Sequence, residues 1–154
     1  MSKYSQRAVE LFKQGYNCSQ SVFAAFCDDI DMDFETALKV SSSFGGGMGR
    51  LREVCGAVSG MFMVAGMKYG YDNPTDKKII AEHYKLIQSL AMQFKEKNGS
   101  LICRELLGLS GDVGSYIPDA RTKEFYKKRP CAGLVGDAAD IMEEYINCFE
   151  KKKV

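Results

Sequence analysis

The chain has 154 residues, a length that fits one domain built around one hydrophobic core. Apolar residues make up 45% of it, which excludes a disordered chain. Its 21 basic and 20 acidic residues leave a net charge of +1, so charge gives no reason to expect a nucleic-acid partner. We predict a single helical domain over residues 1–154.

The first third of the chain carries apolar residues at helical spacing in three segments. Gly15 ends the first segment, Asn17 can cap the second and Asp33 can cap the third. Four glycines then occupy five positions between residues 45 and 49, where no regular element is expected. The three predicted helices span residues 3–14, 18–30 and 33–42.

Helical patterns continue through the rest of the chain. Pro74, Ser100 and Pro130 each suit the start of a helix. No segment alternates at period two, so we expect no significant sheet and an all-α fold, a compact bundle of about six to eight helices. The later predicted helices span residues 54–69, 75–97, 101–107, 120–128 and 130–151.

The longest apolar run covers residues 54–67 and is shorter than the roughly 20 residues that a membrane span needs. The N-terminal residues follow an amphipathic pattern without the apolar region of a signal peptide. We therefore expect a cytoplasmic protein with no membrane span, whose cysteines do not form permanent structural disulfides. Such cysteines are metal ligands, redox-active thiols or buried apolar residues.

The six cysteines divide into two groups by their place in the predicted helices. We expect Cys27 and Cys148, which lie within amphipathic helices, to serve as small core residues. Free N–H groups and a partial positive charge at a helix start stabilise a thiolate and lower its pKa. The remaining four lie at helix starts and are the candidate catalytic and metal-binding residues: Cys18, Cys55, Cys103 and Cys131.

No two cysteines have the Cys-x-x-Cys spacing of thioredoxin or zinc-ribbon sites. A common site therefore requires the tertiary fold to bring four separate helices together. Gly45, Gly46 and Gly47 are candidate cofactor-binding residues, because a glycine-rich backbone can form a nest of N–H groups for an anion. The alternative is a tight bend that brings Cys55 beside Cys18. A nucleotide-binding loop is not expected, because the Walker lysine is missing and no strand precedes the glycines.

Other chemically active residues are few. His83 is the only histidine, so histidine-rich metal sites and Ser–His triads are not expected, and His83 itself is a surface or boundary residue by default. Arg104 and Arg129 adjoin the cysteines at 103 and 131 and could stabilise thiolates. Their default assignment is an ordinary surface position.

The segment from Phe44 to Gly60 reads Phe-Gly-Gly-Gly-Met-Gly-Arg-Leu-Arg-Glu-Val-Cys-Gly-Ala-Val-Ser-Gly. It resembles the signature of the C-GCAxxG-C-C family, a family of redox-active proteins of about this length. That family is named for one cysteine, a Cys-Gly-Ala-x-x-Gly type of motif and two further cysteines. The family string places glycine before the motif cysteine, where this chain has Val54. The matching residues are Cys18, Cys55, Cys103 and Cys131.

The resemblance extends over about residues 5 to 148 and implies redox chemistry at the four cysteines. A related domain occurs with haem in the split-Soret type of cytochrome c, which also carries an iron–sulfur centre. The resemblance therefore favours an iron–sulfur cluster or a thiolate-bound metal ion as the cofactor, and the alternative is no cofactor at all. Covalent haem is not expected, because the chain has no Cys-x-x-Cys-His motif.

Three hypotheses stay open at this point. The first is a redox protein that uses thiol/disulfide exchange or iron–sulfur electron transfer with an unidentified redox partner, and that can form a homodimer. The second is a zinc- or copper-binding structural or trafficking module. The third is a helical interaction domain with buried cysteines. Whether the four sulfurs gather at one place or scatter through the core separates the third hypothesis from the others.

Overall fold

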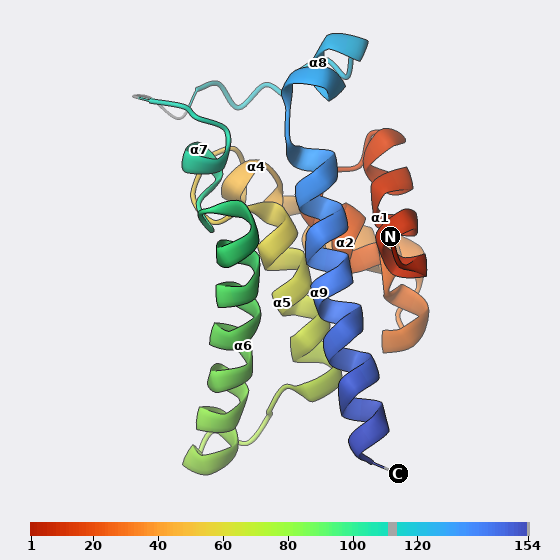
Figure 1. Cartoon of the computed structure of the whole chain (residues 1–154), viewed down its shortest axis with the longest axis vertical. Helices are drawn as coiled ribbons and strands as arrows, with labels where there is room; N and C mark the ends of the chain where they lie inside the picture. The colour runs from red at the N-terminus through yellow and green to blue at the C-terminus, as the bar shows by residue number, and fades with distance from the viewer. Residues whose placement is uncertain (111–113, 154) are drawn as a thin grey trace.

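The computed structural model describes residues 1–110 and 114–153, and most of them are helical (Figure 1). Within these ranges no strand forms, and one isolated antiparallel bridge joins Val54 to Ile102. The prediction of an all-α fold without significant sheet is confirmed. The helical elements are α1 (Lys3–Lys13), α2 (Cys18–Ala25), η1 (Cys27–Ile30), α3 (Phe34–Ser41), η2 (Ser42–Phe44), α4 (Gly45–Met48), α5 (Gly56–Tyr69), α6 (Lys77–Asn98), α7 (Cys103–Leu106), α8 (Lys123–Lys128) and α9 (Cys131–Lys152).

Side-chain caps determine where several helices begin. Asn17 accepts a hydrogen bond from the N–H of Gln20, and the Gln20 side chain accepts one from the N–H of Asn17, which together form the capping box of α2. Asp33 accepts a hydrogen bond from the N–H of Thr36 at the start of α3. The predicted caps at Asn17 and Asp33 are therefore confirmed. No helix in the described part of the chain is long and apolar enough to cross a membrane.

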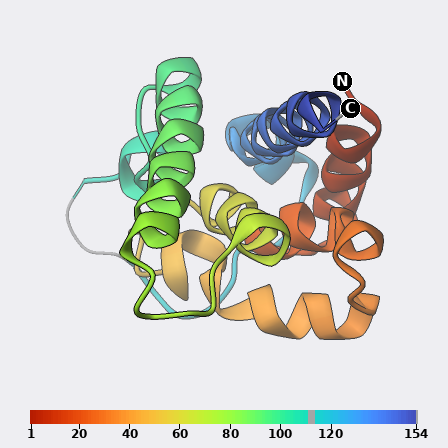
Figure 2. The ribbon, with the colours of Figure 1, turned by 90° about the horizontal axis from the view of Figure 1, so that it is seen from below.

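Helix α5 lies at the centre of the bundle and contacts α2, α6 and α9 (Figure 2). Helix α1 packs against both α2 and α9. Burial of apolar surface on this scale is the main favourable contribution to folding. Large, fully buried side chains from α2, α5, α6 and α9 fill the space between these helices: Phe23, Met61, Phe94 and Met142.

The structure corrects two details of the sequence prediction. The buried residues of α6 all lie in its second half, while Ile79 is 47% exposed and Tyr84 is 53% exposed, so the apolar stripe predicted along its whole length is only partly buried. Cys148 is exposed, and its assignment to the core is wrong, because the last buried residue of α9 is Ile146. The assignment of Cys27 to the core is confirmed, since that residue is 2% exposed.

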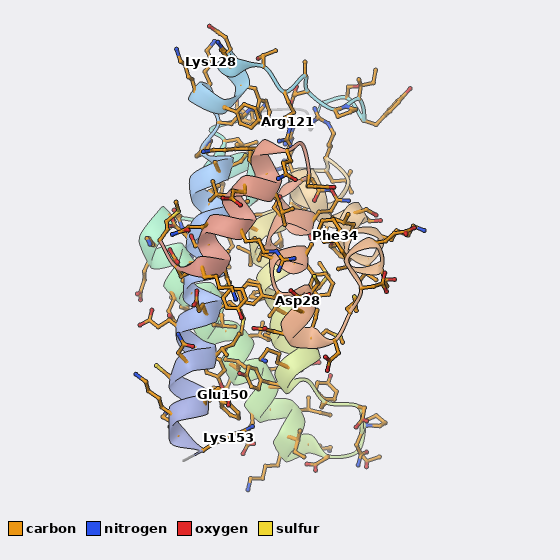
Figure 3. The ribbon with its side chains drawn as sticks, turned by 90° about the vertical axis from the view of Figure 1, so that its right-hand side faces the viewer. Asp28, Phe34, Arg121, Lys128, Glu150 and Lys153 are labelled. Carbon is orange, nitrogen blue, oxygen red and sulfur yellow. The ribbon has the colours of Figure 1, made fainter. Side chains whose placement is uncertain are left out.

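The starts of α5, α7 and α9 lie at one end of the bundle. Figure 1 shows α4, α7 and the first turns of α5 and α9 at this end, with the C-terminus at the other. Figure 3 places Arg121 and Lys128 at the same end and Glu150 and Lys153 at the opposite one. Cys55, Cys103 and Cys131, which lie at the starts of α5, α7 and α9, therefore share one end of the molecule.

Helices α2 and α5 approach closely because Gly60 has no side chain. A Cβ atom at Gly60 would lie 2.9 Å from the backbone oxygen of Ser19, whereas one at Gly66 would meet nothing within 4 Å. We expect Gly60→Ala to lower the free energy of unfolding by about 1–3 kcal/mol, the usual cost of overpacking a core. We expect Gly66→Ala to raise it by up to about 1 kcal/mol, the helix-propensity difference between the two residues.

Urea unfolding of both variants beside the parent chain measures these changes. Equal shifts in the same direction for the two variants would contradict the close approach at Gly60.

Candidate four-cysteine site

The site begins with a left-handed turn of the backbone. Residues 46–50 all have positive φ, between 61° and 73°, and they follow Gly45, which is extended, so Phe44 is the last right-handed residue before the turn. This conformation costs L-residues roughly 1–2 kcal/mol each and glycine far less, and three of the five residues are glycine. The sequence predicts no regular element here, and the structure shows one short left-handed turn. At Gly47 a Cβ atom would lie 2.6 Å from the Cβ of Cys103 and 2.7 Å from the Cα of Arg52.

A short antiparallel pairing follows this turn and brings two cysteines together. The N–H of Cys55 donates to the carbonyl of Leu101 at 2.8 Å, and the N–H of Cys103 donates to the carbonyl of Glu53 at 2.6 Å. Residues far apart in sequence are thereby fixed side by side. The start of α7 therefore lies beside the start of α5 without any Cys-x-x-Cys spacing.

The other two cysteines reach the same place from α2 and α9. A Cβ atom at Gly56 would lie 3.1 Å from the Cβ of Cys18, so the start of α5 packs directly on the start of α2. Cys131 is the first residue of α9, and its thiol and that of Cys18 line the same cavities and shift each other's pKa in opposite directions. The tight bend predicted before Cys55 thus does place that residue near Cys18.

All four cysteines line one cavity of about 30 Å³, together with leucine side chains. Cys55 and Cys103 are buried, and Cys18 and Cys131 are half-buried. All six cysteines are free thiols. In the ranges that the structure describes, no group of three or more Cys, His, Asp or Glu side chains is arranged to hold a metal ion. The catalytic or metal-binding role of the four cysteines stays a prediction.

A second, larger cavity of about 330 Å³ adjoins the first, and Cys18 and Cys131 line both. This cavity borders solvent at Tyr116, which is 88% exposed. Among the described residues, Asp119 is its one acidic lining residue. Its basic lining residues are Arg50, Arg52, Arg121 and Arg129.

Three of these arginines converge on a single carboxylate oxygen. The Oδ2 atom of Asp119 lies 3.2 Å from a guanidinium nitrogen of Arg50, 3.2 Å from one of Arg129 and 3.9 Å from one of Arg52. Arg121 donates instead to the backbone oxygens of Phe12, at 2.8 Å, and Tyr16, at 3.0 Å. Its guanidinium also lies 4.3 Å from the centre of the Phe12 ring, which ties the segment before α8 to the end of α1 (Figure 3).

Arg52 connects the two cavities, because it lines both. Its side chain is 6% exposed, and one terminal nitrogen donates to the sulfur of Cys103 at 3.7 Å. The Nε–H of Arg52 has no hydrogen-bond partner among the described residues. A buried guanidinium with a free N–H is costly, which makes this position unusual.

The environment sets the ionisation of the thiols unequally. The hydrogen bond from Cys18, together with the nearby guanidinium groups of Arg129, Arg121 and Arg52, lowers the pKa of Cys131 to about 7 against the effect of burial. The same hydrogen bond and burial hold the pKa of Cys18 well above its usual range. When the pair loses one proton, Cys131 is therefore the thiol that gives it up, and Cys18 stays protonated.

Burial raises the pKa of Cys55 to about 12, although the N–H groups of Ala57 and Val58 favour its thiolate. The prediction that these cysteines lie at helix starts is confirmed, since Cys55 is the N-cap residue of α5 and the others are first residues of their helices. The prediction that a helix start lowers the pKa is wrong for Cys18 and Cys55. Loss of hydration outweighs the helix-start effect at Cys55, whereas at Cys18 the interaction with Cys131 is the larger cause and burial the second.

The outcome also differs among the other residues that the sequence singled out. Arg129 lies at the Cys131 thiol, so its default assignment to an ordinary surface position is wrong, whereas Arg104 pairs with Glu53 at 3.3 Å. His83 is a half-buried boundary residue, as predicted. The three candidate glycines line the cavities, and their role in holding a cofactor stays a prediction. Gly45 and Gly46 line the larger cavity, and Gly46 and Gly47 line the smaller one.

Sequence reasoning missed the arginines at 50, 52 and 121 and the acidic residue at 119. Arg50 and Arg52 directly follow the glycine run, and that proximity could have marked them as part of the site. Arg121 and Asp119 carry no such signal, because their place depends on how the segment before α8 folds back over α1.

The lowered pKa of Cys131 predicts a distinct pH profile for alkylation. Because the thiolate is the reactive form, the rate of iodoacetamide labelling at Cys131 should rise through a midpoint near pH 7, below the ordinary midpoint of about 8.5. Cys55 should stay unlabelled up to pH 8 in the folded protein, since its pKa is raised to about 12. Peptide mapping by mass spectrometry measures both rates, in a Cys148→Ser background that removes the exposed thiol.

Replacing Cys18 by Ala should move the Cys131 midpoint upward, since it removes the donor to the thiolate. A Cys131 midpoint at or above the ordinary value in the parent chain would contradict this account of the pair.

Comparison with known proteins shows the family to which the chain belongs. The chain matches the model of a family described as "Putative redox-active protein (C_GCAxxG_C_C)" over residues 16–145. It is also 24% identical over 148 residues to an uncharacterized protein of Archaeoglobus fulgidus, with 90% of each chain covered. No solved structure matches the chain. Because the family model spans most of the chain and includes all four cysteines at helix starts, the protein belongs to the C_GCAxxG_C_C family.

Proposed function

We propose that the protein carries out thiol–disulfide redox chemistry at Cys18 and Cys131. The observation that carries this proposal is that Cys18 and Cys131 both line the two adjoining cavities, the larger of which borders solvent, and that each thiol shifts the pKa of the other. Two thiols that line the same cavity are placed to form a disulfide with little movement. The guanidinium groups around Cys131 favour its thiolate, the form that attacks disulfides.

The reaction proceeds in two exchange steps. The Cys131 thiolate attacks one sulfur of a disulfide substrate, forming a mixed disulfide and releasing the other half of the substrate as a thiolate. Cys18 then gives up its proton to the released thiolate and attacks the Cys131 sulfur, which releases the second half of the substrate. Two electrons pass to the substrate, and the protein is left with a Cys18–Cys131 disulfide. A dithiol partner protein reduces this disulfide by the same exchange in reverse.

Each neighbour of the pair supports one step. Arg129 and Arg121 stabilise the charge on Cys131 before attack. Cys18 holds the proton until the mixed disulfide has formed, so the two thiols do not compete as nucleophiles. Cys55 and Cys103 lie beside the pair in the smaller cavity.

Treatment of the reduced protein with a small disulfide should produce a Cys18–Cys131 linkage, detected by peptide mapping without reduction. Cys131→Ser should abolish it, because the attacking sulfur is missing. Cys18→Ser should trap the substrate half as a stable mixed disulfide on Cys131, because the resolving sulfur is missing. Cys148→Ser serves as the control and should behave as the parent chain does, since Cys148 is exposed on α9.

A parent chain that never forms the Cys18–Cys131 linkage would overturn the proposal. A Cys18→Ser variant with no adduct on Cys131 would do the same.

A second candidate function is electron transfer by a bound iron–sulfur cluster, and the observation that favours it is that four thiols line one cavity. Cysteine thiolates are the usual ligands of such clusters, so the donor set fits. Cys18, Cys55, Cys103 and Cys131 would hold the group, and binding would displace their protons. A bound cluster supplies one-electron transfer. A zinc or copper ion could be bound by the same four thiolates instead. The site would then be a metal-binding site without an iron–sulfur cluster.

Anaerobic incubation with ferrous iron and sulfide tests the second candidate. A cluster held by the four thiols should give visible charge-transfer absorption that each of their four single Cys→Ser variants weakens or abolishes. Cys27→Ser and Cys148→Ser are matched controls and should keep it, because neither residue lines the cavity. Parallel incubations with zinc and with copper(I), followed by elemental analysis, measure the metal-ion variant. A protein that stays colourless and metal-free in all three incubations would remove this candidate.

Two further expectations stay predictions. A cytoplasmic location would keep the thiols reduced between catalytic turns. The second expectation is a homodimer, which sedimentation of the reduced protein at several concentrations tests.

A further inference from the structure

We infer that the larger cavity binds the oxyanion of a small substrate, a carboxylate or phosphate group, with the rest of that substrate directed to Cys131. The identity of the substrate rests on the proposed function. Thiol–disulfide exchange at Cys131, combined with an oxyanion site in the same cavity, makes small anionic disulfides the substrate class. The anion-binding part stands on the cavity alone.

The first observation is an excess of positive charge. Four guanidinium groups line the cavity, whereas Asp119 is the one carboxylate that lines it in the described ranges. Three of the four already share a single oxygen of that carboxylate. Like charges gathered in a cavity repel one another, so a bound anion would stabilise the arrangement.

The second observation is the unpaired donor of Arg52. Its side chain is 6% exposed, and its Nε–H has no partner in the described part of the chain. Buried polar groups in folded proteins almost always have a partner, so a free N–H on a residue that lines a cavity indicates a missing acceptor. Guanidinium groups bind planar carboxylate and phosphate oxygens through two parallel hydrogen bonds, which makes an oxyanion the fitting acceptor.

The third observation is the size and lining of the space. The cavity of about 330 Å³ matches the lower end of the range for small-molecule sites, roughly 300–1,000 Å³. Aromatic side chains of Phe12, Tyr116 and Phe125 line it beside the arginines. Cys131 lines the same space, so a molecule whose anionic end lies on the arginines has its other end within reach of the sulfur.

The arginines could instead serve only to stabilise the Cys131 thiolate. Arg50 separates the two explanations, because it donates to the Ser115 carbonyl at 2.8 Å and pairs with Asp119. If the cavity binds an oxyanion, Arg50 contributes to affinity without altering the thiol. Arg104 provides the matched control, since it lies outside this cavity and pairs with Glu53.

Binding is measured without any redox step, in the full-length Cys18→Ser/Cys131→Ser chain by calorimetry. The probes are dithiodiglycolate, which is anionic, cystamine, which is cationic, and inorganic phosphate. We expect saturable binding of dithiodiglycolate, about tenfold weaker after Arg50→Gln and unchanged after Arg104→Gln, and no binding of cystamine. Competition by phosphate identifies a site for either oxyanion, and its absence identifies one for carboxylates. Equal binding of the anionic and cationic disulfides, or of neither, overturns the inference.

Reaction is measured in the chain that keeps Cys18 and Cys131. Oxidation by dithiodiglycolate should be faster than by the neutral bis(hydroxyethyl) disulfide, and the advantage should fall with added salt and after Arg50→Gln. The midpoint of Cys131 alkylation should not move in Arg50→Gln. Saturable anion binding without oxidation by either disulfide overturns the thiol–disulfide function and leaves the anion site. Oxidation at equal rates by both disulfides, without anion binding, overturns the anion site and leaves the function.

Discussion

The left-handed turn at residues 46–50 is the constraint on which the rest of the site depends. It reverses the chain after α3 within so few residues that residues 53–55 can pair with residues 101–103. Met48 and Arg50 adopt positive φ without being glycine, at roughly 1–2 kcal/mol each. Backbone hydrogen bonds from Arg52 to Gly46 and from Glu53 to Gly47 help to offset that strain. Any side chain at Gly47 would collide with Cys103, so the turn packs directly against the thiol cluster.

Competition between hydration and local charge then decides which thiol reacts. Every cysteine of the cluster lies at a helix start, and each therefore has the same favourable position in principle. Burial reverses the effect at Cys55, and the shared hydrogen bond reverses it at Cys18. Cys131 alone combines a helix start, a thiol donor and nearby guanidinium groups with exposure to the larger cavity. A reactive thiolate at Cys131 beside a protonated thiol at Cys18 is what stepwise exchange requires.

Patterns local in sequence predicted much of this arrangement. The caps at Asn17 and Asp33, the glycine run and the apolar periodicity each act over a few residues, so they indicated the helices and the division of the cysteines. The exposed position of Cys148 and the ionisation of Cys55 depend on how far neighbouring helices extend and how deeply a side chain is buried. The arginine-lined cavity depends on contacts between distant segments, such as Arg121 with Phe12. Such contacts leave no periodic signal in the chain.

The two cavities share a wall, and that wall explains why the arginines and cysteines belong to one site. Cys18, Cys131, Gly46 and Arg52 line both spaces, so charge on one side acts directly on sulfur on the other. Arg52 extends this link to the buried thiols through its contact with Cys103. A ligand that neutralises the arginines would therefore weaken their hold on the Cys131 thiolate. If the larger cavity binds an oxyanion, its binding and the ionisation of Cys131 would be coupled through Arg52, Arg121 and Arg129, whichever chemistry the four cysteines perform.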